Sequence, residues 1–141
     1  MNKMTYPELM QHIVKLPGWT WEWKFGDMGF YGNETVIILG SNNRGFIGTW
    51  RPSIKDTDVL KVNGLVPLPS VEQLDELFDK AGYDLHVKRT GPTFKVIAVS
   101  RTTGNRAQIY CDEKHLHETI TESFARVVLG YKFDGKEFGK C

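Results

Sequence analysis

The sequence lacks the features that define a membrane, secreted or disulfide-stabilised protein. No apolar run approaches the roughly 18 residues of a membrane span, and no basic segment precedes an apolar core as in a signal peptide. Its two cysteines, Cys111 and Cys141, are too few for a disulfide framework. We therefore expect a cytoplasmic protein that does not bind membranes.

An excess of charge of one sign is also missing. The 18 basic and 17 acidic residues give a net charge of +1, so no long-range field favours nucleic acid, although a local basic patch is compatible with this balance. Hydrophobic residues (40%) and charged residues (25%) have the proportions of a globular chain. A length of 141 residues allows one substantial core or two small ones.

Motifs of enzyme chemistry are missing as well. The chain has no Ser-His-Asp order, nucleophile elbow, phosphate-binding loop or paired-carboxylate motif. We predict no catalytic residue and no cofactor, and an enzyme of unrecognised type stays the least favoured alternative. Cys111, His115 and His117 are candidate zinc ligands by residue type, but the two histidines diverge on a helix and no fourth ligand is near in the sequence. No metal site is predicted.

What is present most clearly is an αβββα pattern in residues 67–130. Ser70 and Gln73 form a capping box for a helix that Gly82 ends. Apolar residues then alternate with polar ones through three short strands, and Asp112 begins a closing helix that ends at Gly130. The predicted strands are Tyr83 to Lys88, Phe94 to Val99 and Ala107 to Cys111.

Residues 1–66 show a similar αβββ order. A helix is predicted from Tyr6 to Leu16, followed by a strand in which Trp19, Trp21 and Trp23 share one face. The remaining predictions are a mobile or sharply turned connection at Gly26 to Gly32, strands at Thr35 to Leu39 and Phe46 to Trp50 around a turn at Gly40 to Gly45, and a linker from Arg51 to Pro67 with a short strand at Val59 to Val62. Residues 131–141 form a tail that is either an edge strand or loose.

The two halves match in pattern. Gly18, Trp19, Trp21 and Trp23 fall on Gly82, Tyr83, Leu85 and Val87 at one constant offset. This match indicates either an internal duplication or two units that merely share a polarity pattern. In both cases we expect an α+β fold with six strands and three helices, the helices packed on one face of antiparallel sheets.

A resemblance to a known family covers mainly residues 68–129. The Pro-Leu-Pro-Ser-Val-Glu-Gln-Leu opening (67–74), the Lys80 to Tyr83 junction and the closing helix resemble small bacteriophage-encoded proteins with phage ABA-sandwich-type domains. The resemblance implies a phage or prophage origin and a compact accessory protein, with no catalytic residues to carry over.

The αβββα order also resembles the double-stranded-RNA-binding domain, and Gly91-Pro92 stands where such domains often carry that pair. The chain departs from that family at the start of the last helix. Instead of a lysine cluster it has Asp112 to Glu118, whose acidic residues would repel phosphate.

Aromatic and arginine residues supply the predicted binding site. They either form the core of the first half or present a recognition surface, because tryptophan, tyrosine and arginine dominate binding hot spots. The candidates are Trp21, Trp23, Phe30, Tyr31, Arg44, Trp50 and Arg51.

We predict a non-catalytic binding protein, encoded by a phage or prophage, that inhibits or modulates a host or defence protein in the manner of an anti-CRISPR. The alternative is a nucleic-acid or nucleotide binding module. Its candidate residues are Lys88, Arg89, Lys95, Arg101 and Arg106. The oligomeric state stays open.

Overall fold

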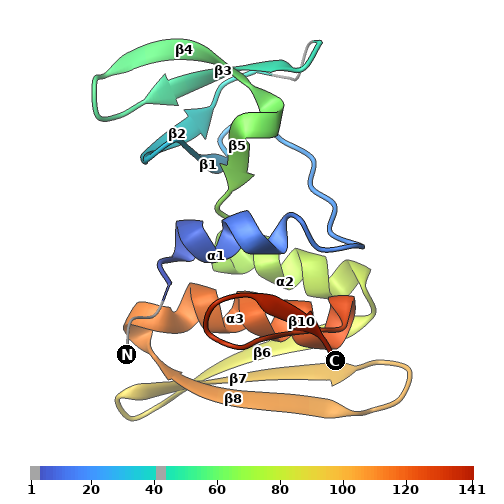
Figure 1. Cartoon of the computed structure of the whole chain (residues 1–141). Coiled ribbons are helices and arrows are strands. Elements are labelled where there is room, and N and C mark those ends of the chain that lie inside the picture. Colours follow the sequence, from blue (N-terminus) through green and yellow to red (C-terminus); the bar gives the residue numbers. More distant parts are fainter. Residues whose placement is uncertain (1–3, 41–43) are drawn as a thin grey trace. The chain divides into compact units, whose positions relative to one another are not determined.

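The computed structural model describes residues 4–40 and 44–141, so Ser41, Asn42 and Asn43 of the predicted turn lie outside the described residues. Within these ranges the chain has ten strands and three α-helices, and the strands pair antiparallel (Figure 1). The α+β class is confirmed, but the predicted count of six strands is too low. The α-helices are α1 (Tyr6–Ile13), α2 (Val71–Lys80) and α3 (Leu116–Phe124).

The chain forms two compact units. The first contains the residues up to Tyr6, Leu16–Gly18 and Ser70–Cys141; the second contains Pro7–Lys15 and Trp19–Pro69. None of the helices in the described ranges combines the length and the apolar character needed to cross a bilayer.

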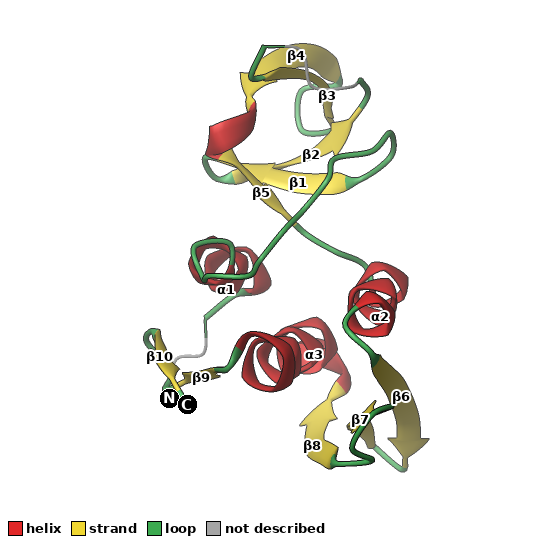
Figure 2. Cartoon of the chain, turned by 90° about the vertical axis from the view of Figure 1, so that its right-hand side faces the viewer, coloured by secondary structure: helices red, strands yellow, loops and turns green. Residues whose placement is uncertain are grey.

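The first unit is built on the strands β6 (Tyr83–Thr90), β7 (Thr93–Ser100) and β8 (Arg106–Asp112), in that order in the sheet. Helices α2 and α3 pack on one face of it (Figure 2). Ser70 and Gln73 form the predicted capping box, in which the Gln73 amide donates to Ser70 Oγ over 3.2 Å and the Ser70 amide to Gln73 Oε1 over 2.9 Å. The helix ends where Gly82 takes a φ of +89°, a backbone conformation that glycine adopts without strain.

Phe78 is the centre of this unit's core. It is fully buried on α2, and its ring meets those of Phe124 and Tyr83 edge-on, with centroids 5.2 Å and 6.4 Å away. Edge-to-face contacts of this kind add to the stabilisation from burial alone. Beyond α3 the helix continues as a π-helical turn, Ala125–Leu129, and this helix ends at Gly130 as predicted.

The tail is neither an edge strand of this sheet nor loose. Strands β9 (Tyr131–Phe133) and β10 (Phe138–Lys140) form a separate hairpin. Asp134 caps its turn by accepting hydrogen bonds from the amides of Lys136 and Glu137, which hold the pKa of its carboxyl below the usual range.

The second unit is built on a five-stranded sheet with the order β4-β3-β2-β1-β5. A 3₁₀ turn, Val62–Gly64, connects β4 to β5 along the chain. The strands are β1 (Met28–Tyr31), β2 (Glu34–Ile38), β3 (Phe46–Arg51), β4 (Asp56–Lys61) and β5 (Leu65–Pro67). Its core is a cluster of buried aliphatic side chains: Val36, Ile38, Ile47, Leu60 and Leu65.

The strand predicted at Trp19 to Trp23 is wrong, because these residues form a loop. Their alternation serves ring packing instead of strand pairing. The rings of Trp19 and Trp21 stack with centroids 6.2 Å apart, and Trp23 meets Trp21 edge-on at 6.1 Å. The Trp23 ring also occupies the space above Gly29, where a Cβ atom would lie 3.0 Å from it.

Two segments predicted as connections contain strands. The glycine-rich stretch Gly26 to Gly32 holds β1, which pairs with both β2 and β5, and the linker Arg51 to Pro67 holds β4 and β5. The pattern match between the halves therefore sets the loop at Trp19 to Trp23 against strand β6, and a duplication is not confirmed.

Candidate functional site

The register of the five-stranded sheet assigns its side chains to two faces. Residues that pair directly across strands point to the same side, and side chains alternate along each strand. The inner face carries the buried cluster around Ile38 and Ile47. The opposite side carries eight apolar residues, which we call the outer apolar face: Met28, Phe30, Ile37, Leu39, Phe46, Trp50, Val59 and Val66.

The outer apolar face is exposed to solvent. Val59 keeps 63% of its surface accessible, Met28 48%, Phe46 44% and Leu39 39%, while Phe30, Ile37 and Trp50 are half-buried. A solvated face of an antiparallel sheet is normally polar, so that apolar and polar residues alternate along each strand. Strand β2 departs from this rule at Val36 to Ile38, where consecutive residues on both sides of the sheet are apolar.

The residues of this face are neighbours in space. Met28 pairs with Ile37, and Ile37 pairs with Trp50, which makes one continuous row across three strands. In the next row Gly48 stands between Leu39, whose amide donates to the Gly48 carbonyl over 2.9 Å, and its partner Val59. Because Gly48 has no side chain, this row is shallow in the middle.

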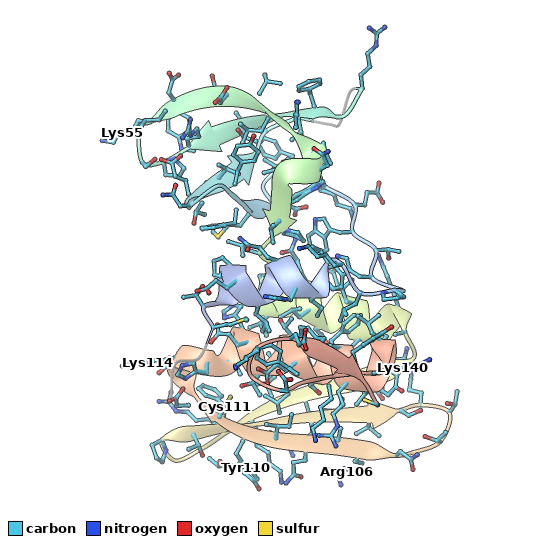
Figure 3. All side chains as sticks on the ribbon, in the orientation of Figure 1. Lys55, Arg106, Tyr110, Cys111, Lys114 and Lys140 are labelled. Carbon is cyan, nitrogen blue, oxygen red and sulfur yellow. The ribbon has the colours of Figure 1, made fainter. Side chains whose placement is uncertain are left out.

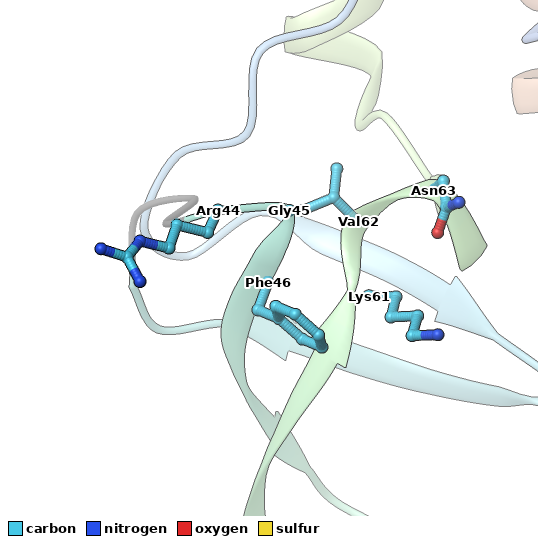
Figure 4. Close-up of a pocket in the computed structure, with 6 residues that line it drawn as sticks. All are labelled: Arg44, Gly45, Phe46, Lys61, Val62 and Asn63. Atoms are coloured by element: carbon cyan, nitrogen blue, oxygen red, sulfur yellow. The ribbon is translucent and has the colours of Figure 1, made fainter.

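A pocket of about 410 Å³ lies at one end of this face (Figure 4). Phe46 and Lys61 pair across β3 and β4 and lie side by side, while Arg44 lies just before the start of β3 with its side chain pointing away from both. The described residues that line the pocket include no acidic one: Arg44, Gly45, Phe46, Lys61, Val62 and Asn63. An apolar floor with two cations suits an aromatic or aliphatic group that carries a negative charge.

The free edge of β4 is closed to strand addition. The amide of Thr57 donates to Asp56 Oδ1 and the amide of Val59 to Asp58 Oδ1, each over 2.8 Å. Charged side chains along an edge strand also oppose pairing with another chain. A partner is therefore expected on the face of this sheet, not on its edge.

The structure divides the residues that the sequence predicted for partner binding. Phe30 and Trp50 lie on the outer apolar face, and Arg44 lines the pocket. Trp23 and Tyr31 instead pack against the inner cluster. Trp21 is half-buried, and its indole nitrogen is buried without a hydrogen-bond partner in the described part of the chain.

Arg51 belongs to a polar network on the inner side of the sheet. Its guanidinium donates to Glu34 through Nε (2.9 Å) and Nη2, and its Nη1 lies 3.4 Å from Asp58 Oδ2. The hydrogen bonds from Arg51 and then from Ser53 hold the pKa of Glu34 below its usual range. Arg51 thus ties β2, β3 and β4 together.

The basic residues predicted for nucleic-acid binding are divided too. Lys88, Lys95 and Arg106 lie on the face of the three-stranded sheet that α2 and α3 leave open. Arg89 lies over the Phe94 ring, 5.6 Å from its centroid, on the helix side. Arg101 donates to Asp79 and Asp84 over 2.8 Å each and so joins the end of α2 to β6.

The candidate zinc ligands Cys111, His115 and His117 do not form a cluster in the described part of the chain. His115 bonds Asp112 over 2.6 Å, and the ring of His117 lies against Tyr6 with centroids 5.3 Å apart. Across residues 4–40 and 44–141, no cluster of three or more His, Cys, Asp and Glu side chains could hold a metal ion. Burial raises the pKa of the Tyr6 hydroxyl, which keeps it in its neutral form.

Comparison with protein-family models, curated proteins and solved structures finds no match for this chain. The two family resemblances in the sequence therefore stay predictions. What the site can do rests on its own geometry.

Six residues of the outer apolar face were not among the predicted site residues: Met28, Ile37, Leu39, Phe46, Val59 and Val66. One sequence signal points to them. Thr35 to Leu39 is apolar at nearly every position, and a strand of a small sheet that is apolar on both sides either is buried on both or exposes one apolar side.

Proposed function

We propose that this protein is a non-catalytic binding protein that docks on a partner protein through the outer apolar face and the adjoining pocket. The observation that carries the proposal is the exposure of Met28, Leu39, Phe46 and Val59 on one side of a sheet whose other side already supplies the core. A contiguous apolar surface of this kind marks an interaction site.

The composition of the face specifies the partner's surface. Trp50 and Phe46 are the residue types that anchor interfaces, and an aromatic or aliphatic group of the partner can fill the shallow row over Gly48. Lys61 and Arg44 at the pocket call for a carboxylate beside that group. The partner is thus a protein with an apolar patch bordered by an acidic side chain.

The role of an inhibitor or modulator of a host or defence protein follows the phage-like pattern of residues 67–83 and belongs to the same proposal. It requires that the bound partner lose activity. An activity assay of the captured partner, with and without the protein, tests this part separately from binding.

Binding is tested by capture with a tagged protein, identification of the partner and reconstitution from purified components. Val59→Thr keeps a β-branched residue in β4, and Leu39→Ser shortens its neighbour in the shallow row; together we expect them to weaken the reconstituted complex about tenfold or more. Ile54→Thr is the matched control, because Ile54 is 55% exposed in the turn between β3 and β4 and lies off the face.

Lys61→Glu reverses one positive charge of the pocket and should raise the dissociation constant of the same complex. The factor of increase should be larger at low salt than at high salt, because salt screens the interaction. Equal affinity of all variants would refute the proposal. Self-association of the purified protein that Val59→Thr abolishes would also refute it, since the occupant of the face would then be a second copy.

A further inference from the structure

The three-stranded sheet of the first unit has one covered and one uncovered face. Helices α2 and α3 pack against the side that carries Val96 and Ala98. In Figure 3 the side chains of Arg106 and Tyr110 extend from β8 on the other side, away from these helices. The register assigns twelve residues to this uncovered side, which we call the open face: Asp84, His86, Lys88, Thr90, Thr93, Lys95, Ile97, Val99, Arg106, Gln108, Tyr110 and Asp112.

Tyr110 presents an oriented aromatic ring on the open face. Its side chain keeps 57% of its surface accessible, and Gln108 Nε2 lies 3.2 Å from its hydroxyl. Lys95, its direct partner across β7 and β8, places Nζ 5.9 Å from the ring centroid. The two neighbours restrict the ring while leaving its surface accessible to a stacking group.

The open face also concentrates positive charge. Lys88 and Lys95 stand directly opposite each other on β6 and β7, an arrangement of like charges that destabilises a sheet unless an anion bridges it. Arg106 adds a third cation at the other end of β8. In residues 4–40 and 44–141, none of these three lies within ion-pair distance of a carboxylate.

The two carboxylates of the open face, Asp84 and Asp112, bond residues outside it. Asp84 accepts a hydrogen bond from Arg101 over 2.8 Å, and Asp112, at the end of β8, bonds both the amide and the ring of His115. The acidic stretch that counts against double-stranded-RNA binding begins at this Asp112, which stands at the end of the open face opposite Thr93, and continues beyond β8 into α3. Its three cations, Lys88, Lys95 and Arg106, against two carboxylates leave the open face with a positive net charge.

We propose that the open face binds single-stranded nucleic acid, with a base stacked on Tyr110 and backbone phosphates at Lys88, Lys95 and Arg106. A cationic groove or face with an aromatic platform is the recurring arrangement for single strands, because every base has a π-face and every linkage a charge. The Gln108 amide beside the ring can bond the edge of the stacked base. Arg106 lies four residues from Tyr110, about 13 Å along the strand, so the site spans more than one nucleotide.

The three cations set the expected salt dependence. Each phosphate neutralised on a single strand contributes about −0.7 to the slope of log K against log salt, so three give about −2. Lys95→Gln should reduce the magnitude of the slope by about 0.7. Tyr110→Leu should keep the slope and weaken binding about 5- to 150-fold, the loss expected for one stacked base.

The test is fluorescence anisotropy of labelled 12-nucleotide single strands of DNA and RNA titrated with the whole protein at several salt concentrations. Lys114→Gln is the charge control, because Lys114 is an exposed lysine of the same unit that follows β8 and lies off the open face. Phe25→Leu is the aromatic control, since Phe25 is 79% exposed in the other unit. Both controls should bind as the unchanged protein does.

Several results would overturn the proposal. These are no binding at low salt, equal loss in Lys95→Gln and Lys114→Gln, unchanged affinity in Tyr110→Leu, or displacement of the strand by an equal concentration of polyglutamate, which would assign the face to an acidic polypeptide. Melting temperatures verify that each variant folds. Lys88→Gln on the edge strand β6 repeats the charge test if Lys95→Gln lowers the melting temperature. Because the outer apolar face takes no part, variants at Val59 should leave this binding unchanged.

Discussion

Replacing Gly29 by alanine examines how the tryptophan loop packs on the five-stranded sheet. Gly29 lies in β1 and is buried, and its backbone is not in the left-handed region. A Cβ atom added there would lie 3.0 Å from Cη2 and 3.2 Å from Cζ3 of Trp23. The alanine methyl group therefore displaces the indole or bends the strand.

Two opposing effects set the magnitude. Overpacking of a well-filled interior costs about 1–3 kcal/mol. Removing a glycine from a strand returns about 0.5–1 kcal/mol. We expect Gly29→Ala to lower the free energy of unfolding by about 0.5–2 kcal/mol.

Gly48→Ala is the matched control. Gly48 lies in β3 of the same sheet, and the nearest atom to an added Cβ is the Gly40 nitrogen at 4.0 Å, so nothing clashes. This variant should be neutral or more stable by about 0.5 kcal/mol. Urea unfolding followed by far-ultraviolet circular dichroism measures both, because tryptophan fluorescence would report the altered ring itself.

A double-mutant cycle identifies the cause. In a Trp23→Leu background the clash disappears, so Gly29→Ala should there resemble Gly48→Ala. Equal effects of Gly29→Ala and Gly48→Ala in the unchanged protein, or the same loss in both backgrounds, would refute the packing of Trp23 over Gly29.

Three further perturbations address other parts of the molecule. Phe78→Ala should cost about 3–5 kcal/mol in urea unfolding, because Phe78 is fully buried against Phe124, whereas Phe25→Ala at an exposed position should change little; a loss below about 1 kcal/mol would contradict the assigned core. Ser70→Ala should cost about 1 kcal/mol by removing the cap of the Gln73 amide, and an unchanged stability would exclude the capping box. The pKa of Glu34 is lower in the folded protein than in the unfolded chain, so its contribution to stability is present above the unfolded pKa and is lost as the pH falls through the folded pKa. The difference in melting temperature between the unchanged protein and Glu34→Gln should therefore narrow on acidification, and a constant difference would show that the Arg51–Glu34 pair does not cause it.

The three-stranded unit follows from the sequence because its signals are local. The capping box at Ser70 and Gln73 and the glycine at 82 fix helix ends within a few residues of chain. The turns after Thr90 and Ser100 then let each strand pair with the next strand along the chain. Little depends on contacts between distant residues.

The five-stranded sheet depends on distant contacts, and here the sequence misleads. The alternation of Trp19, Trp21 and Trp23 is typical of a strand, yet the rings stack on one another and cover Gly29. Because glycine is typical of flexible segments, Gly29 also contributed to the wrong prediction of a connection where β1 lies. Asp56 and Asp58 favoured a loop, although they lie in an edge strand and bond its free amides.

The candidate site was predictable only in part. Aromatic content pointed to Phe30 and Trp50, but which side of each strand faces the core depends on the register among β1, β2 and β3. That register places Tyr31 and Arg51 on the inner side, one residue away from the two that face outward. The three-stranded sheet gives a second example: Arg89 follows Lys88 directly in β6 and therefore lies on the opposite face.

The most direct test of the docking surface is the dissociation constant of the reconstituted complex for Val59→Lys compared with Ile54→Lys. Both variants add one lysine at an exposed apolar position of the same unit, and only Val59 lies on the outer apolar face. We expect Val59→Lys to bind at least about tenfold more weakly, a difference of about 1.4 kcal/mol, and Ile54→Lys to bind as the unchanged protein does. Equal dissociation constants for the two variants would contradict a partner seated on this face.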